Sequence, residues 1–275
     1  MEEARFDSGP TRPAAGIGVV CDPLSTMGFM LAAQTHANGR VVQLTIDRPA
    51  RRNAVDHATL AALAGALEHA VSSSARVVVL TGAGGVFSAG ADLTGVEGPD
   101  FSSALFKVLM LLSTAPLVTI AAVDGPALGA GTQLASFCDL RVATERSRFG
   151  IPAAKLGLAI DRETVHRVVE LCGGATARAM LLSADTIDGS RAFALGYVQR
   201  TGDLTDALSW AAEIAELAPL TLRAHKTSLM SVNEPNNGPL AAKARAEAAA
   251  AWGSEDLVEG RTAFMEKRKP NFLGR

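Results

Sequence analysis

The first half of the chain alternates short, uniformly apolar runs with segments whose apolar residues recur every three or four positions. Short apolar runs are typical of strands buried on both faces, and the longer periodic segments are typical of helices that bury one face. The expected strands span 41–46, 77–80, 117–123 and 139–144, and the expected helices span 58–71 and 101–113. This alternation favours an α/β core with a mostly parallel sheet.

The two ends of the chain differ from this core. Residues 1–36 are rich in Gly, Pro, Ser and Thr and have no sustained period, so we expect a disordered leader. From about Arg162 the pattern is nearly all helical. The helices expected there are 162–172, 175–182, 188–195, 204–218, 219–231, 239–252 and 254–267. We therefore divide the chain into a leader (1–36), a core (37–200) and a helical C-terminal region (201–275).

Two glycine-rich loops, 82–93 and 128–133, each follow an expected strand. Each is expected to bend the chain and then begin a helix, which exposes unpaired backbone N–H groups at the positive end of the helix dipole. Two such ends meeting at one point would bind an oxyanion such as a polarised thioester carbonyl. Neither loop has the spacing of a dinucleotide-binding turn or a P-loop, and a pair of packing turns is the alternative interpretation.

Composition narrows the class of protein. The chain has 275 residues and a net charge of −2, which does not indicate a nucleic-acid-binding surface. Its three cysteines, Cys21, Cys138 and Cys172, are widely spaced, as in reduced cytosolic proteins and unlike a disulfide framework or a metal site. No apolar run reaches the roughly 18–20 residues of a membrane span. We expect a cytoplasmic protein with no metal, no membrane span and no nucleic-acid partner.

Several segments stand in a fixed order along the chain. They are a first-strand signature (45–55), a loop (87–93), a second loop (123–131) and later markers at 138–141, 149–152, 192–198 and 264–270. Together they resemble the crotonase (enoyl-CoA hydratase/isomerase) superfamily over about residues 37–273. The resemblance implies a spiral core of ββα units and a helical C-terminal region that forms a homotrimer or a dimer of trimers. It also implies a coenzyme A (CoA) thioester as the ligand and no other cofactor.

The resemblance implies a role for individual residues of the CoA site. The backbone N–H groups of Ala91 and Ala130 match the oxyanion hole, although the family usually has Gly where Ala130 stands. The residues expected along the CoA adenine and pantetheine are Ser88, Ala89, Gly90, Ala91, Asp92 and Leu93. Arg51 and Arg52 match positions that meet CoA phosphates or the ribose, and solvated surface is the alternative for both.

Two residues near the C-terminus match positions that, in this family, close the CoA site of a neighbouring protomer. They are Phe264 and Lys267. For Phe264 the alternative is an ordinary core aromatic of the last helix.

The sequence departs from the family at the two glutamates that hydratases place around a water. Gln133 and Ala153 stand at those positions. Water addition to a conjugated thioester needs a base for the water and an acid for the α-carbon, and neither an amide nor a methyl group fills these roles near neutral pH. Asp161 matches a catalytic aspartate of the dienoyl-CoA isomerase branch and is a candidate replacement. The competing interpretation makes it the N-cap of the helix 162–172, where hydrogen bonds make a carboxylate a weak base.

A looser resemblance concerns the subgroup. Segments 149–161, 177–184 and 251–254 are similar to actinobacterial enoyl-CoA hydratase-like proteins that lack both glutamates and bind acyl-CoA. The first hypothesis is therefore a protein of lipid metabolism that binds fatty acyl-CoA and has little or no hydratase activity. The second is an active hydratase or isomerase that uses Asp161 as its acid/base, and an isomerase needs only one proton shuttle.

Overall fold

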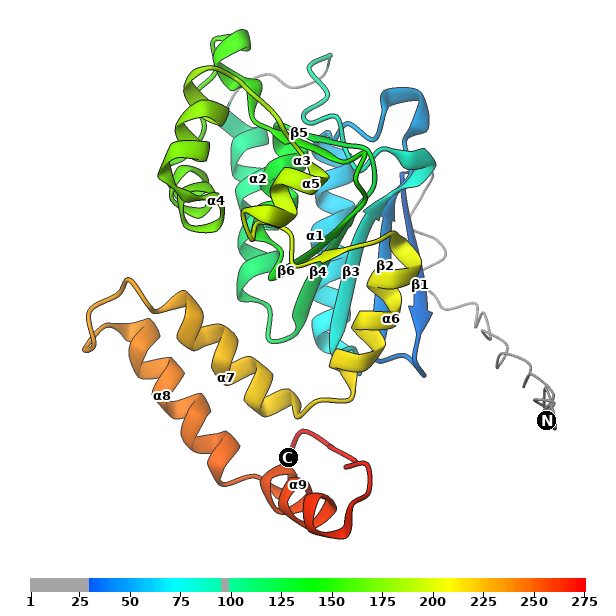
Figure 1. The fold of residues 1–275 in the computed structure, drawn as a ribbon, viewed down its shortest axis with the longest axis vertical. Helices are drawn as coiled ribbons and strands as arrows, with labels where there is room; N and C mark the ends of the chain where they lie inside the picture. The colour runs from blue at the N-terminus through cyan, green and yellow to red at the C-terminus, as the bar shows by residue number, and fades with distance from the viewer. Residues whose placement is uncertain (1–29, 95–98) are drawn as a thin grey trace, which may run out of the picture.

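A six-stranded sheet forms the centre of the molecule (Figure 1). The computed structural model describes residues 30–94 and 99–275. The strands lie in the order β1 (Leu31–His36), β2 (Val41–Ile46), β3 (Val77–Gly82), β4 (Val118–Val123), β6 (Leu140–Ala143) and β9 (Arg200–Thr201). Strand β1 is antiparallel to β2, and every later neighbour is parallel to the one before it. The expected α/β core with a mostly parallel sheet is therefore confirmed.

A smaller sheet carries the second glycine loop. Its strands are β5 (Pro126–Leu128), β7 (Arg148–Gly150) and β8 (Ile187–Asp188), with β7 in the middle. Strand β5 is parallel to β7, and β8 is antiparallel to β7. Strands of two or three residues are too short to show a period, which is why the sequence pattern did not predict them.

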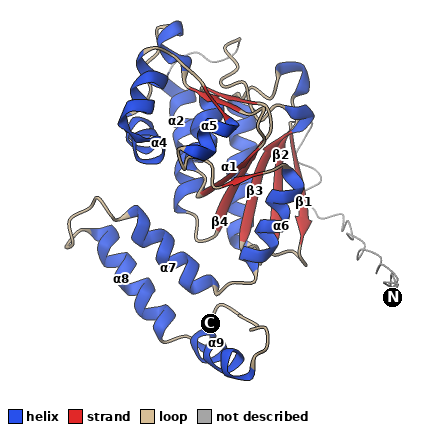
Figure 2. Ribbon diagram, in the orientation of Figure 1, coloured by secondary structure: helices blue, strands red, loops and turns tan. Residues whose placement is uncertain are grey.

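Helices cover both faces of the large sheet because its central strands are apolar at nearly every position (Figure 2). Leu80 packs in one cluster with helices α1 (His57–Ser72) and α2 (Pro99–Thr114). Its neighbour Val79 points the other way and packs with α6 (Leu204–Ala215). Successive strand residues alternate between faces, so uniformly apolar strands require a cover on each side.

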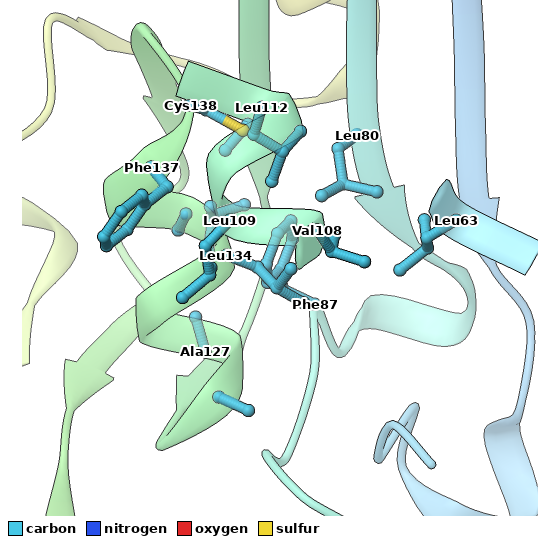
Figure 3. Close-up of a cluster of buried hydrophobic side chains, with 14 of the residues drawn as sticks. Leu63, Leu80, Phe87, Val108, Leu109, Leu112, Ala127, Leu134, Phe137 and Cys138 are labelled. Atoms are coloured by element: carbon cyan, nitrogen blue, oxygen red, sulfur yellow. The ribbon is translucent and has the colours of Figure 1, made fainter. Parts of the chain in front are cut away.

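The larger apolar cluster lies directly behind the two glycine loops (Figure 3). Phe87, from the first loop, is fully buried beside Leu109 of α2 and Leu134 of α3 (Ala130–Phe137). Ala127 of β5 belongs to the same cluster. Burying a Phe side chain is worth roughly 1.5–3 kcal/mol. Core packing therefore fixes the position of the first loop relative to the second.

The segment after β7 contains helices α4 (Arg162–Leu182) and α5 (Gly189–Ala194). Helix α4 is interrupted at Gly173, whose φ is +77°. Its two halves correspond to the helices expected over 162–172 and 175–182. Among the described residues, short 3₁₀ helices are formed by Pro49–Arg51, Ala83–Gly85 and Pro152–Leu156.

Three helices extend away from the sheet as an arm (Figure 1). They are α7 (Pro219–Met230), α8 (Pro239–Trp252) and α9 (Glu255–Glu266). Lys226 of α7 is buried and forms an ion pair with Asp139 at 2.7 Å, which joins the arm to the core. The helices expected over 219–231, 239–252 and 254–267 are confirmed within a residue at each end.

The expected leader needs a correction at its C-terminal end. Residues 1–29 lie outside the described residues. Leu31–His36 form the edge strand β1, which pairs along its whole length with β2. Only Leu31 of this strand is fully buried, so the strand has too little apolar character to stand out in the sequence. The boundary between core and C-terminal region at residue 200 stays a prediction.

Candidate active site

A cavity of about 640 Å³ lies between the two glycine loops, helix α2 and the segment 151–161. The five positions that the sequence assigned to the oxyanion hole, the glutamate pair and the candidate acid all line this cavity: Ala91, Ala130, Gln133, Ala153 and Asp161. Much of the remaining wall is apolar and comes from α2 and the segment after β7, including Phe101, Leu105, Phe106, Leu109, Leu156 and Leu158. The fold thus gathers the candidate oxyanion, glutamate and acid positions at one apolar cavity.

The two glycine loops are joined by backbone hydrogen bonds. The N–H of Ser88 donates to the carbonyl oxygen of Pro126 at 3.0 Å, and the N–H of Leu128 donates to that of Ser88 at 2.9 Å. Gly90 marks a close approach of the two loops, because a Cβ there would lie 2.9 Å from the Leu128 carbonyl oxygen. Its φ of +108° also favours glycine. The two loops therefore act as one rigid unit.

The N–H of Ala91 is free for a reason that the sequence did not predict. The first loop does not begin a helix at this point, because α2 starts only at Pro99. Instead, Val55 bridges the loop: its N–H donates to the Gly90 carbonyl oxygen at 2.8 Å, and its carbonyl oxygen accepts from Asp92 N–H at 2.8 Å. A parallel bridge of this kind leaves the intervening N–H, that of Ala91, without an acceptor in the described part of the chain.

The second loop does begin a helix, as expected. Gly129 is the N-cap of α3 with φ +52°, so the positive φ falls on glycine and Ala130 is the first helical residue. The N–H of Ala130 has no acceptor among residues 30–94 and 99–275. A Cβ on Gly90 would lie 3.6 Å from this nitrogen, which places the two loops side by side at the cavity. Buried Arg141 donates to carbonyl oxygens at the other end of α3, where a cation is favourable.

Gln133 is held by a polar network at the cavity wall. Its Nε2 donates to Oγ1 of Thr164 at 2.9 Å and to Oδ2 of Asp161 at 3.3 Å. The Thr164 hydroxyl in turn donates to Oδ2 of Asp161 at 2.7 Å, and Thr164 N–H donates to Oδ1 at 2.7 Å. The Asp161 carboxylate therefore accepts from three groups of the protein.

Asp161 is the N-cap of α4, which confirms the interpretation of this residue as a cap. The same residue also lines the cavity. Ala153 lies in the 3₁₀ helix Pro152–Leu156 and lines the cavity with its methyl group. Neither Gln133 nor Ala153 carries a carboxylate.

The expected CoA loop divides into residues that line the cavity and residues that hold the loop. Those lining it are Ala89, Gly90, Ala91 and Leu93. Ser88 is fully buried, and its Oγ accepts from the Gly90 N–H at 3.2 Å. Its expected place along CoA stays a prediction. Asp92 is also buried, and it forms an ion pair with Arg48 at 3.1 Å.

Asp92 and Arg48 belong to a charge network that fixes the loop to helix α1. Arg48 also pairs at 2.7 Å with Asp56, the N-cap of that helix. The hydroxyl of Thr94, which donates to Asp92 at 2.7 Å, holds the pKa of the Asp92 carboxyl below its usual value, and Arg48 acts in the same direction. Asp92 is thus a charged anchor within the loop.

Arg51 and Arg52 lie beside this loop and are exposed. Ala89 N–H donates to the carbonyl oxygen of Arg52 at 3.0 Å, so the two segments are in direct contact. In the described ranges neither guanidinium has an ion-pair partner. Both side chains are therefore exposed on the surface beside the first glycine loop.

Phe264 and Lys267 do not line the cavity of their own chain. Phe264 lies on α9 with 85% of its surface exposed, so the alternative of a core aromatic is wrong. Lys267 is the exposed C-cap of the same helix. Their place on the arm leaves them free to meet another molecule.

Sequence reasoning missed two residues that the site depends on. Thr164 connects Gln133 to Asp161, and its position three residues after the cap was a usable signal. Arg48 fixes the CoA loop, but only the fold brings it to Asp92. Within the residues that the structure describes, no group of three or more His, Cys, Asp or Glu is placed to hold a metal ion. No helix in those ranges has the length and apolar character to cross a membrane.

The fold and the cavity define an α/β protein of the crotonase type, with two free amides at an otherwise apolar site. The chain belongs to the enoyl-CoA hydratase/isomerase family, whose model matches residues 36–275. It is 42% identical over 235 residues to a probable enoyl-CoA hydratase of Mycobacterium tuberculosis, covering 85% of this chain and 96% of that one. It is 37% identical over 245 residues to a 2,3-dehydroadipyl-CoA hydratase of Escherichia coli, covering 86% and 96%.

Solved structures agree with this assignment. An enoyl-CoA hydratase from Polaromonas superposes with a TM-score of 0.81 at 28% identity, covering 89% of this chain and 100% of that chain. The superfamily that the sequence resembles is therefore confirmed, together with its fold.

Proposed function

We propose that the cavity binds a fatty acyl-CoA thioester and that the protein hydrates enoyl-CoA slowly or not at all. The observation that carries this proposal is the pairing of two free amides with an absent glutamate pair. The N–H groups of Ala91 and Ala130 lie at neighbouring loops and have no acceptor in the described residues. Gln133 and Ala153 face the same cavity and supply neither a base nor an acid.

The thioester carbonyl would lie between the two amides, where hydrogen bonds favour a polarised oxygen. The acyl chain would follow the apolar wall formed by α2, since burying each extra CH₂ contributes about 0.8 kcal/mol. Arg51 and Arg52, exposed beside the loop, would meet the CoA phosphates. This arrangement supports an acyl-CoA carrier or presenter in cytoplasmic lipid metabolism.

A second candidate is an isomerase that uses Asp161 as its only acid/base. The observation in its favour is that Asp161 lines the cavity. Against it, the carboxylate already accepts three hydrogen bonds from Thr164 and Gln133. A group held in this way has to give up contacts before it takes a proton from a ligand.

We also propose a homotrimer or a dimer of trimers in which Phe264 and Lys267 reach a neighbour's CoA. Large apolar side chains of the arm are exposed, including Leu229, Trp252, Val258, Phe264 and Met265. Exposed apolar surface of this kind favours association.

Calorimetry and a hydration assay on the same preparation test the main proposal. Long-chain acyl-CoA is expected to bind in the micromolar range and more tightly than free CoA. Hydration of crotonyl-CoA is expected to be at least about 10³-fold slower than in an efficient enzyme, because two proton-transfer groups are missing. The absence of binding heat with any acyl-CoA up to millimolar concentration would refute the proposal.

A further inference from the structure

The polar network fixes which end of the Gln133 amide faces the cavity. The hydroxyl of Thr164 has one hydrogen, which it donates to Oδ2 of Asp161 at 2.7 Å. Its oxygen can then only accept, and an ionised carboxylate can only accept. The amide end that lies 2.9 Å from Thr164 and 3.3 Å from Asp161 must therefore be the NH₂ group. A flipped amide would place its acceptor Oε1 against the acceptor Oδ2 of the Asp161 carboxylate.

The other end of this amide is left for a ligand. Oε1 of Gln133 has no donor among residues 30–94 and 99–275. The residue is only 6% exposed, and it lines the cavity. A water in the cavity can serve this acceptor while the site is unliganded. A ligand that displaces the water leaves the acceptor unsatisfied unless the ligand itself brings a donor.

The place of Gln133 in helix α3 relates its Oε1 to the expected position of the thioester. Gln133 follows Ala130 by three residues in α3, so both lie on the same face of that helix. A thioester oxygen at the Ala130 N–H would therefore place the first carbons of the acyl chain beside Oε1. Resting on the function proposed above, we infer that the cavity selects acyl thioesters with a hydroxyl on these carbons, as in a 3-hydroxyacyl chain.

The selection follows from hydrogen-bond chemistry. A hydroxyl donates to Oε1 and replaces the displaced water. A saturated or enoyl chain leaves the acceptor buried without a partner. The 3-oxo oxygen of a 3-oxoacyl chain is itself an acceptor, so it and Oε1 of Gln133 repel each other. Leaving a buried acceptor unmatched corresponds to about 10- to 100-fold in affinity.

Competition binding with three CoA thioesters of equal chain length tests the inference: 3-hydroxyacyl, saturated acyl and 3-oxoacyl. In the parent protein the hydroxyacyl ligand is expected to bind about 10- to 100-fold more tightly than the other two. Gln133→Met, similar in size and without an acceptor of this strength, is expected to lose that preference.

Two further variants examine the role of Thr164 in orienting the amide. Thr164→Val removes the hydroxyl that orients the amide and is expected to reduce the preference. Thr164→Ser keeps the hydroxyl and is expected to restore it. Equal affinity for the hydroxyacyl and saturated ligands in the parent would overturn the inference and leave the proposed function standing. Failure of all three ligands to bind would overturn both.

Discussion

The substitution Gln133→Glu puts a carboxyl group where an amide now donates to Asp161. Nε2 of Gln133 lies 3.3 Å from Oδ2 of Asp161. Two unit negative charges at this separation would repel by about 5 kcal/mol at an effective dielectric constant of about 20. The introduced carboxyl avoids this repulsion by keeping its proton, as one member of a close carboxyl pair does. The pKa of the introduced group is therefore raised in the folded state.

The free-energy cost of keeping that proton sets the size of the expected loss in stability. An unperturbed Glu has a pKa of about 4.3, and each pH unit above it corresponds to about 1.36 kcal/mol. Because the folded-state pKa is raised, the penalty is absent below about pH 4 and grows as the pH rises toward the folded-state pKa. Relative to the parent, Gln133→Glu is expected to lose about 1 kcal/mol of unfolding free energy at pH 5 and about 3–4 kcal/mol at pH 7.

Urea denaturation at the two pH values measures this difference. The matched control is Gln34→Glu, since Gln34 is exposed on β1 and the same chemical change there should cost less than about 0.5 kcal/mol. The double variant Gln133→Glu with Asp161→Asn removes the charge pair and keeps a residue that caps well. Its loss of unfolding free energy is therefore expected to be similar at pH 5 and pH 7. An equal loss at pH 5 and pH 7 in Gln133→Glu would refute the reasoning.

The contact between residue 133 and Asp161 also determines which substitutions are needed to give the protein hydratase activity. The pair Gln133→Glu and Ala153→Glu introduces carboxyl groups at the two positions that the resemblance assigns to the hydratase glutamates, but the first would keep its proton beside Asp161. A protonated carboxyl is not a base for water. Adding Asp161→Asn is therefore expected to raise the crotonyl-CoA hydration rate well above that of the double variant. Equal rates in the two variants would contradict this coupling.

Three more variants have clear expectations. Asp161→Asn in the parent should change the unfolding free energy by less than about 1 kcal/mol, because Asn caps helices about as well as Asp, and urea titration measures this. Gly90→Ala should lower stability by about 1–3 kcal/mol and weaken acyl-CoA binding in calorimetry, since its Cβ would meet the Leu128 carbonyl oxygen 2.9 Å away at a φ of +108°. Phe264→Ala with Lys267→Ala should weaken CoA binding and reduce association in light scattering; unchanged CoA affinity in this variant would count against shared sites.

Periodicity predicted the large elements well, because each carries enough residues to show its period. Strands β2, β3 and β4 and the helices of the arm appear within a residue or two of where the sequence places them. The strands of the small sheet were missed because two or three residues show no period. The edge strand β1 was taken for disordered leader, since only Leu31 in it is fully buried.

The site was predictable where backbone geometry follows from local sequence. Gly129 has the positive φ that begins α3, so the free amide of Ala130 could be located in advance. The free amide of Ala91 has another origin, a bridge to Val55 from a distant segment. The network of Gln133, Thr164 and Asp161 likewise depends on two helices meeting, which spacing along the chain does not encode.

The central claim is that the cavity holds a thioester without performing proton transfer on it. Native mass spectrometry of the protein mixed with one equivalent of an enoyl-CoA in deuterated water tests this directly. After exchangeable hydrogens are returned to light water, the bound ligand is expected to have the mass of the unchanged enoyl-CoA. A bound ligand heavier by one water with one carbon-bound deuterium, formed at a rate within about 10³-fold of an efficient hydratase, would establish a hydratase. An enoyl-CoA that has gained deuterium on carbon would establish an isomerase; either result would contradict the account.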